Sequence, residues 1–239
     1  MTYQTKYRSF FFGSSVRLSQ NTLDRLILIF RSKQPSDDDF PCLIHLSADR
    51  HESILNGRGI VKHIKIPESG HVVVKDYKRG GLVYYFNQDL HINIGGKIRS
   101  QREFDMLVQA KKAGVNVPEP VAYAGRGSLF YRTWLITKRI NNYQNFADLS
   151  LKDSKRAVQI FPEISDSIKK LIKAHIYHVD LHPGNILIDM NNKNYIIDFD
   201  KAFIFKGSKH KLIRLYKKRW ARAVLKYHLP DFILIPDLT

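Results

Sequence analysis

Three polar side chains in the second half of this 239-residue sequence have the order and spacing of a phosphoryl-transfer centre. Asp180 and Asn185 lie five positions apart in the string HVDLHPGN, and Asp198 follows Asp180 by 18 positions in YIIDFD. In protein-kinase-like sites, an Asp accepts the proton of the attacking hydroxyl, and a later Asn and Asp bind the Mg²⁺ that accompanies ATP. The pattern predicts Asp180 as the catalytic base and Asn185 and Asp198 as metal ligands of an ATP-dependent phosphotransferase.

The surrounding sequence predicts the elements that would position these residues. Residues 186–189 predict a short strand, residues 190–194 a polar turn and residues 195–198 a returning strand. Residues 162–175 carry apolar side chains at helical spacing, so a buried helix should lead into the catalytic loop. Each polar residue taken singly could simply cap a turn. Their order, spacing and strand context together favour phosphoryl transfer.

A phosphoryl-transfer centre also needs a lysine on the phosphates and a glutamate that holds this lysine. Lys75 lies near the end of a predicted β-hairpin over residues 57–77, in the apolar run HVVVKDY. Glu103 lies on a predicted helix over residues 99–114, which has apolar residues at helical spacing and ends on a glycine. We expect Lys75 to pair with Glu103 and to contact ATP. The alternative is a strand-end lysine and a surface glutamate.

The phosphate loop is less clear. Gly57 and Gly59 could let backbone N–H groups approach phosphate, but the full glycine-rich motif is absent, and an ordinary turn is an equal alternative. Val179 replaces the arginine that usually precedes the catalytic Asp, and Asp200 replaces the glycine that usually follows the metal-binding Asp-Phe pair. These departures argue against control by phosphorylation of an activation loop.

The remaining elements are predicted from periodicity. Residues 117–127 and 130–140 predict two more strands, and residues 141–149 a short helix after the crossover between two lobes. Residues 1–50 predict one helix, with Asn21 as its cap, followed by a polar loop. Strands and helices therefore mix as in an α+β fold.

The C-terminal part is strongly basic, with nine Lys or Arg residues and no acidic residue between Lys206 and Lys226. Residues 206–229 predict a helix. Its packed stripe would comprise Leu212, Leu215, Tyr216, Ala223 and Tyr227. The basic side chains either form a solvated face or dock on an anionic surface, and the sequence leaves both open.

Composition narrows the possible partners. The formal net charge of +17 predicts a polyanionic partner: nucleic acid, an anionic membrane surface or an anionic substrate. The sequence holds no recognisable nucleic-acid-binding module, so we expect no nucleic-acid partner. The single cysteine, Cys42, excludes an intrachain disulfide. Because the sequence carries neither a secretory signal nor a membrane-spanning apolar run, we expect the chain to remain in the cytosol.

Longer stretches of the sequence resemble one family. NGRG, VVVKDYKRGGL, REFDMLVQAKKAGVNVPEPVAYA, HVDLHPGNILID and IIDFDKA are similar to strings of the bacterial 3-deoxy-D-manno-octulosonic acid (Kdo) kinases of the lipopolysaccharide kinase family. The resemblance covers residues from about 50 to 230. HxDLHPxN alone is shared with aminoglycoside and other small-molecule kinases. KDYKRGGL, followed by the REF helix and the PEP strand, narrows the resemblance to this family.

The resemblance implies a bilobal protein-kinase-like fold. An N-terminal lobe, residues 1–139, would hold an antiparallel sheet and one key helix, and residues 140–239 would form a small, mainly helical C-terminal lobe. The resemblance also implies ATP and Mg²⁺ as cofactors and phosphorylation of a Kdo hydroxyl, expected to be the 4-hydroxyl, on a lipid A precursor. The family's site roles fall on Lys75, Glu103, Asp180, Asn185 and Asp198.

The implied acceptor gives the positive charge a purpose, because it carries sugar carboxylates and lipid A phosphates at the cytoplasmic face of the bacterial inner membrane. The protein would bind this membrane peripherally. Lys78 and Arg79, in the KDYKRGGL insert, are expected to contact anionic groups of the acceptor. No obligate protein partner is inferred.

Two other kinds of function remain open from the sequence. A small-molecule (aminoglycoside-like) kinase or a protein kinase could use the same centre, although the small C-terminal lobe disfavours a protein kinase and the positive charge disfavours a cationic drug as acceptor. A kinase-fold membrane- or RNA-binding module without activity is the other alternative. The intact set of Lys75, Asp180, Asn185 and Asp198 argues against a degenerate site.

Overall fold

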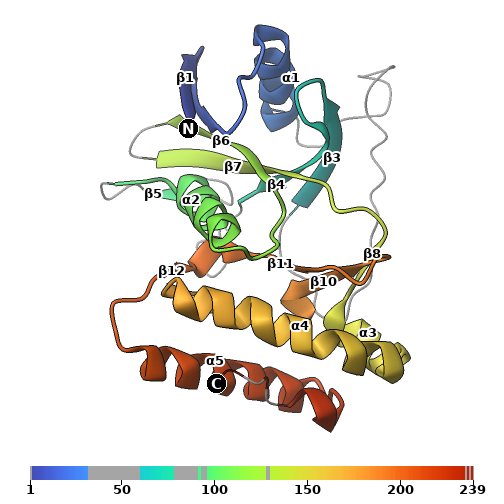
Figure 1. The fold of residues 1–239 in the computed structure, drawn as a ribbon. Coiled ribbons are helices and arrows are strands. Elements are labelled where there is room, and N and C mark those ends of the chain that lie inside the picture. The colour runs from blue at the N-terminus through green and yellow to red at the C-terminus, as the bar shows by residue number, and fades with distance from the viewer. Residues whose placement is uncertain are drawn as a thin grey trace. The chain divides into compact units, whose positions relative to one another are not determined.

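The computed structural model describes residues 2–31, 60–77, 91–92, 96–127, 130–234, 236 and 238, which fall into two compact units (Figure 1). The first unit contains the described residues up to Phe104 and those between Glu119 and Arg139. The second contains residues 105–118 and the described residues from Ile140 onward. The architecture is mixed α/β, with a large antiparallel sheet in the first unit.

The first unit is built on a seven-stranded antiparallel sheet. Its strands follow the order β1-β2-β6-β7-β4-β3, and β5 pairs with β7 beside this path. The hairpin predicted around Lys75 is confirmed as β3 and β4, whereas the pair β1 and β2 was not predicted. The strands are β1 (Tyr3–Tyr7), β2 (Phe10–Ser14), β3 (Ile60–Ile66), β4 (Gly70–Asp76), β5 (His91–Ile92), β6 (Pro120–Gly127) and β7 (Phe130–Lys138).

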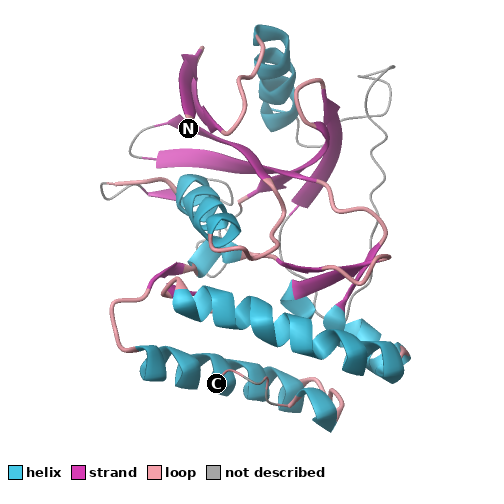
Figure 2. Cartoon of the chain, viewed as in Figure 1, coloured by secondary structure: helices cyan, strands magenta, loops and turns pink. Residues whose placement is uncertain are grey.

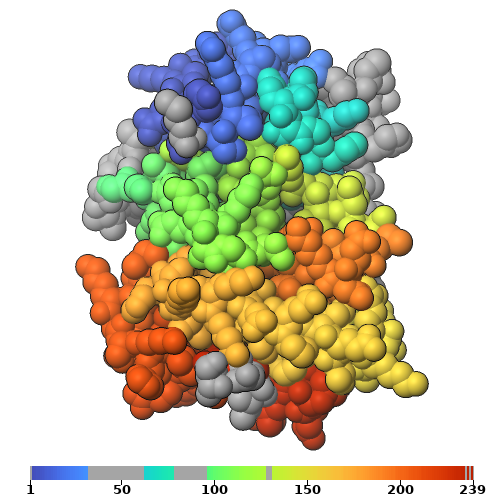
Figure 3. All heavy atoms as spheres, in the orientation of Figure 1, coloured from blue at the N-terminus to red at the C-terminus, as the bar shows by residue number. Residues whose placement is uncertain are grey.

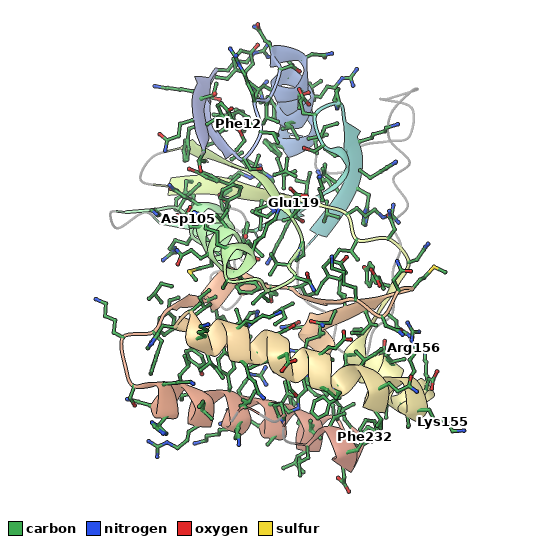
Figure 4. The ribbon with its side chains drawn as sticks, in the orientation of Figure 1. Phe12, Asp105, Glu119, Lys155, Arg156 and Phe232 are labelled. Atoms are coloured by element: carbon green, nitrogen blue, oxygen red, sulfur yellow. The ribbon has the colours of Figure 1, made fainter. Side chains whose placement is uncertain are left out.

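One face of this sheet is covered by α1 (Gln20–Arg31), which contributes Leu23, Leu26, Ile27, Ile29 and Phe30 to an aromatic and aliphatic core shared with the strands. The rings of Phe30 in α1 and Trp134 in β7 stack with their centroids 4.3 Å apart. Phe12 of β2 belongs to the same core and is labelled in Figure 4. Because side chains alternate along a strand, every second strand residue faces α1 and the others face away from it.

The predicted cap of α1 was wrong. The helix begins at Gln20, one residue before Asn21. The hydroxyl of Ser19 accepts a hydrogen bond from the backbone N–H of Thr22 at 3.3 Å, and the Thr22 hydroxyl donates to Glu68. A serine and an asparagine are equally good caps in sequence, so only the contacts decide between them.

The other face of the sheet packs against the start of α2 (Arg99–Lys112). The ring of Phe104 meets Tyr123 of β6 edge-on, with centroids 5.3 Å apart. Lys75 of β4 lies on this face, because it also reaches α2. The helix stops where the sequence predicts, since Gly114 adopts a left-handed φ of +78° that glycine tolerates without steric cost.

The second unit consists of helices and short β-ladders. β10 pairs with β8 and β11 in a three-stranded sheet, β12 pairs with β9, and α4 and α5 lie side by side (Figure 2). The elements are β8 (Tyr143–Asn145), α3 (Phe146–Lys152), α4 (Ser154–Lys173), β9 (Ile176–Tyr177), η3 (Pro183–Asn185), β10 (Ile186–Asp189), β11 (Asn194–Ile196), η4 (Phe199–Lys201), β12 (Phe203–Ile204), α5 (Lys209–Lys226) and η5 (Asp231–Ile233).

Two predicted helix boundaries in this unit were wrong. Residues 141–149 form β8 and then the start of α3, because the side chain of Asn145 accepts from the backbone N–H of Asp148 at 2.8 Å and starts the helix there. The buried helix predicted from Pro162 begins at Ser154 instead. Asp153 caps it by accepting from the backbone N–H of Arg156, labelled in Figure 4, and the proline lies inside the helix.

The basic helix α5 has two opposite faces. Its buried residues are Leu212, Tyr216, Trp220, Ala223 and Val224. Its exposed basic stripe, at intervals of three or four residues, comprises Lys211, Arg214, Lys218 and Arg222. Two of the residues predicted for the packed stripe, Leu215 and Tyr227, are only half-buried, because a spacing of four from Leu212 places the centre of the buried face elsewhere. Within the described ranges, none of the helices is long and apolar enough to cross a bilayer.

Candidate active site

The predicted pairing of Lys75 with Glu103 is present in the first unit. The Lys75 Nζ donates to both carboxylate oxygens of Glu103, at 3.1 and 3.0 Å. The Glu103 side chain is 3% exposed, whereas that of Lys75 is 28% exposed. Removing a carboxylate from water is costly unless charges and hydrogen bonds replace the lost hydration. The arrangement therefore holds the ammonium group in one place, while the lysine side chain as a whole stays partly accessible.

Tyr77 is a member of this cluster that sequence reasoning missed. Its hydroxyl donates to Glu103, and the Lys75 Nζ lies 5.1 Å from the centroid of its ring. Arg99, at the start of α2, lies over the same ring at 5.0 Å. The signal was present in KDY, because residues two apart on a strand face the same side of a sheet.

Asp180 and Asn185 are held together in the second unit by the loop that joins them. The side-chain Nδ2 of Asn185 donates to the backbone carbonyl of Asp180 at 3.0 Å, which orients the amide group. The backbone N–H of Asn185 donates to His182, and its carbonyl accepts from Ile197 at 3.0 Å. The last contact ties this predicted catalytic loop, residues 178–185, to the segment that carries Asp198.

The prediction that Asp198 lies at the end of a strand was wrong. β11 stops at Ile196, and Asp198 adopts a left-handed φ of +64° immediately before η4. Aspartate tolerates this conformation better than most residues other than glycine and asparagine. Asp198 is exposed there, as a predicted metal ligand needs to be.

The buried side chain of His178 connects the catalytic loop to the segment that carries Asp198. Its Nε2 lies 2.8 Å from the carbonyl of Ile197, and its ring meets that of Phe199 edge-on with centroids 4.6 Å apart. The carbonyl can only accept, so Nε2 carries the proton. Burial lowers the pKa of His178, which therefore stays neutral and packs as a spacer between the two segments.

Asp180 has two cationic neighbours that the sequence analysis did not predict. The Lys201 Nζ lies 2.9 Å from Asp180 Oδ2, and the Arg219 Nε lies 3.9 Å from Oδ1. Partial burial alone would raise the pKa of Asp180. The hydrogen bond from Lys201 and the charges of Lys201 and Arg219 outweigh this effect, so the pKa of Asp180 lies below its ordinary value. Asp180 is thus ionised at neutral pH, which is the state that its predicted role as proton acceptor requires.

The loop is also fixed to α5. The hydroxyl of Tyr216 accepts from the backbone N–H of His178 at 2.9 Å and donates to the carbonyl of Ile176 at 2.8 Å. Both contacts are buried. The basic helix therefore supports the backbone just before Asp180.

Asn185 and Asp198 fit the donor chemistry of a magnesium site. The Asn185 Nδ2 is engaged by the Asp180 carbonyl, so its side-chain oxygen is the atom suited to a cation. Among the described residues, no group of three or more His, Cys, Asp or Glu side chains is placed to hold a metal. A kinase-type Mg²⁺ requires fewer protein ligands, because phosphate and water oxygens complete its coordination.

Four predicted site residues lie outside the described residues. They are Gly57 and Gly59 of the proposed phosphate loop, and Lys78 and Arg79 of the proposed acceptor site.

Comparisons with a family model and with individual proteins point to the same family. Residues 49–231 match the family described as "Lipopolysaccharide kinase (Kdo/WaaP) family". Proteins named 3-deoxy-D-manno-octulosonic acid kinase are similar over most of this length. The one from Vibrio vulnificus (strain YJ016) is 34% identical over 184 residues, 74% of this chain and 77% of the relative.

Two more relatives with the same name come from other bacteria. That of Vibrio parahaemolyticus is 28% identical over 213 residues, 86% of this chain and 89% of the relative. That of Stenotrophomonas maltophilia is 33% identical over 179 residues, 74% of this chain and 67% of the relative. The chain therefore belongs to the lipopolysaccharide kinase (Kdo/WaaP) family and is a phosphotransferase.

Proposed function

We propose that this protein transfers the γ-phosphate of ATP to the 4-hydroxyl of a Kdo residue on a lipid A precursor, during synthesis of the lipopolysaccharide inner core. Family membership and the names of the relatives support the reaction and the sugar. The observation that carries the proposal is the hydrogen-bonded assembly of Asp180, Asn185 and the Asp198 segment. The proposed architecture is a protein-kinase-like fold with lobes at residues 1–139 and 140–239.

In the proposed mechanism, Asp180 orients the acceptor hydroxyl and takes its proton as the sugar oxygen forms a bond to the γ-phosphorus. The bond between that phosphorus and the bridging oxygen breaks, and ADP leaves. Lys75, held by Glu103, neutralises charge on the phosphates of ATP. Asn185 and Asp198 would hold Mg²⁺, which supplies positive charge to the phosphate oxygens when bound.

The acceptor can be tested directly. The protein is incubated with ATP, Mg²⁺ and a Kdo-bearing lipid A precursor, and the product is analysed by mass spectrometry. We expect the mass of one phosphate group on the sugar portion, and fragmentation should locate it at the 4-hydroxyl. Parallel reactions with an aminoglycoside and a serine peptide should yield no product. Phosphorylation of either of these, with the Kdo acceptor unmodified, would contradict the proposed substrate.

The metal assignment has its own test. Asp198→Asn keeps a side chain that tolerates the left-handed backbone but removes the charge that a hard cation prefers. We expect the Mg²⁺-dependent part of ATP binding, measured by calorimetry, to fall strongly in this variant. Unchanged Mg²⁺-dependent affinity would mean that another residue, for example Asp200, holds the ion.

We further propose that the protein works as a peripheral protein on the cytoplasmic face of the inner membrane. The exposed basic stripe of α5 and the exposed Phe203 and Ile204 of β12 support this location, since cations and apolar side chains both favour an anionic lipid surface. Figure 3 shows the segment from β12 into α5, in orange-red, on the drawn face. Replacing Lys211 and Lys218 by Glu should reduce sedimentation with anionic vesicles at low salt. Equal sedimentation of the wild type and the double variant would refute this membrane-binding role.

A further inference from the structure

The two cations beside Asp180 differ in how they contact its carboxylate. Lys201 makes a hydrogen bond to one carboxylate oxygen at 2.9 Å. Arg219 approaches the other oxygen only to 3.9 Å, which is too long for a hydrogen bond. Over the described part of the chain, the guanidinium of Arg219 makes no side-chain hydrogen bond, although its side chain is only 24% exposed. Its N–H donors therefore remain available beside the catalytic carboxylate.

The position of Arg219 is set by its neighbours in α5. Tyr216, one turn earlier, is anchored to the backbone of His178 and Ile176. Trp220, the next residue, donates its indole N–H to the carbonyl of Ile233 at 2.6 Å. With buried anchors on both sides, the backbone at Arg219 has little freedom, and the side chain lies at the edge of the buried face next to Asp180.

A guanidinium in this position is suited to an anionic ligand. It presents five N–H donors in a planar fork, which matches the two oxygens of a carboxylate. A partly buried charge with few partners is costly in the free protein, so a ligand that pairs with it gains more than it would at a fully exposed lysine.

The proposed acceptor supplies such a ligand at the required place. A Kdo residue is an octulosonic acid: its carboxylate is attached to the anomeric carbon, two ring carbons from the 4-hydroxyl. When Asp180 holds that hydroxyl, the carboxylate of the same ring lies within reach of a neighbouring side chain. We propose that Arg219 binds the carboxylate of the acceptor sugar while Asp180 takes the proton from its hydroxyl. This inference rests on the proposed function and adds the residue that selects an acidic sugar.

The test pairs a change in the enzyme with a change in the substrate. The variants are Arg219→Gln and, as a matched control, Arg17→Gln, an exposed arginine of the first unit that lies outside the basic stripe of α5. Each protein is assayed with the Kdo-bearing lipid A precursor, dispersed in detergent, and with the same acceptor after conversion of its carboxyl groups to methyl esters. Thermal unfolding and the KM for ATP are measured for every protein.

We expect the wild type and Arg17→Gln to use the ester about 10- to 100-fold less efficiently than the acid, the range expected for a charge-assisted hydrogen-bonded contact. Arg219→Gln should lose a similar factor with the acid but show little further loss with the ester. Its KM for ATP and its unfolding temperature should match those of the control. Arg219→Lys should recover part of the preference, because one point charge replaces the fork.

Two outcomes would overturn the inference while leaving the proposed function intact. One is equal use of acid and ester by the wild type, and the other is a full ester penalty in Arg219→Gln. If the wild type phosphorylates neither acceptor, the proposed function itself fails and the inference fails with it.

Discussion

Two lysine–carboxylate pairs, one in each unit, have nearly equal distances but opposite surroundings. The Lys75 Nζ lies 3.0 Å from Glu103, and the Lys201 Nζ lies 2.9 Å from Asp180. Glu103 is 3% exposed and also accepts from Tyr77, whereas Asp180 is 33% exposed and Lys201 is 64% exposed. In the first pair a buried carboxylate positions a lysine. In the second, an accessible lysine lowers the pKa of the carboxylate that we propose as the catalytic base.

The largest expected effect concerns the accessible pair. Asp180→Asn keeps the shape of the side chain but removes the proton acceptor, so kcat should fall by roughly 100-fold or more, the usual scale for lost general-base assistance. The unfolding temperature and ATP affinity should change little. Steady-state ADP release and thermal unfolding measure the two quantities. Near-normal turnover would mean that Asp180 is not the base.

The buried pair should show its effect mainly in stability. Glu103→Gln leaves Lys75 without its counter-charge and places an amide against donors that need an acceptor. We expect a loss of about 1–3 kcal/mol in the free energy of unfolding, typical of an unsatisfied buried group, together with a higher KM for ATP. Denaturant titration measures the first quantity and initial rates the second.

The Lys138–Glu119 pair provides the control for this variant. Its atoms lie 2.9 Å apart, but both side chains are exposed, and Glu119 is labelled in Figure 4. Glu119→Gln should cost less than about 1 kcal/mol, as is usual for a surface ion pair. Equal losses in the two variants would remove the distinction between buried and accessible pairs.

The catalytic loop should also be a source of acid sensitivity. Burial, assisted by the nearby charge of Arg219, lowers the pKa of His182 to about 4, and burial lowers that of His178. An unfolded histidine binds a proton near pH 6.5, whereas the folded protein keeps the His182 ring neutral down to about pH 4. The free energy of unfolding is therefore fully retained above pH 6.5 and decreases as the pH falls towards 4, because protonation favours the unfolded chain. The slope is at most about 1.4 kcal/mol per pH unit for each group. In unfolding titrations, His182→Gln should have a shallower dependence between pH 6.5 and 4; an unchanged slope would contradict this origin.

The smallest effect on stability is expected at Lys201. Lys201→Met removes an exposed partner, so the free energy of unfolding should change by less than about 1 kcal/mol. The pKa of Asp180 should rise towards its ordinary value, and the acid limb of the pH–rate profile should therefore move to higher pH. An unmoved acid limb would show that the lysine does not adjust the carboxylate during catalysis.

Sequence patterns predicted the buried pair, Lys75 and Glu103, but not the accessible pair, Lys201 and Asp180. Strand alternation placed Lys75, helical periodicity placed Glu103, and both are confirmed as partners. The spacing of Asp180 and Asn185 reflects a short loop whose hydrogen bonds are mostly local, so it could be read directly. Their catalytic roles remain predictions.

Lys201 and Arg219 could not be predicted in the same way. With 39 Lys and Arg residues in the chain, sequence alone cannot say which two reach a given carboxylate, and Arg219 arrives from a helix 39 positions after Asp180. The start of α4 was missed for a related reason: Pro162 is a common first helical residue, but an upstream cap at Asp153 decided the boundary. Side-chain contacts between distant segments carry this information, and local patterns do not.

The hydroxyl of Tyr216 has a practical consequence for measuring motion. The amide hydrogen of His178 is bonded to this oxygen and not to a backbone carbonyl. Its exchange with deuterated solvent therefore requires α5 to separate locally from the catalytic loop, and not the opening of a β-ladder. The exchange rate of this single amide reports how often the support behind Asp180 comes apart, and an acceptor or a membrane that stabilises α5 should slow it.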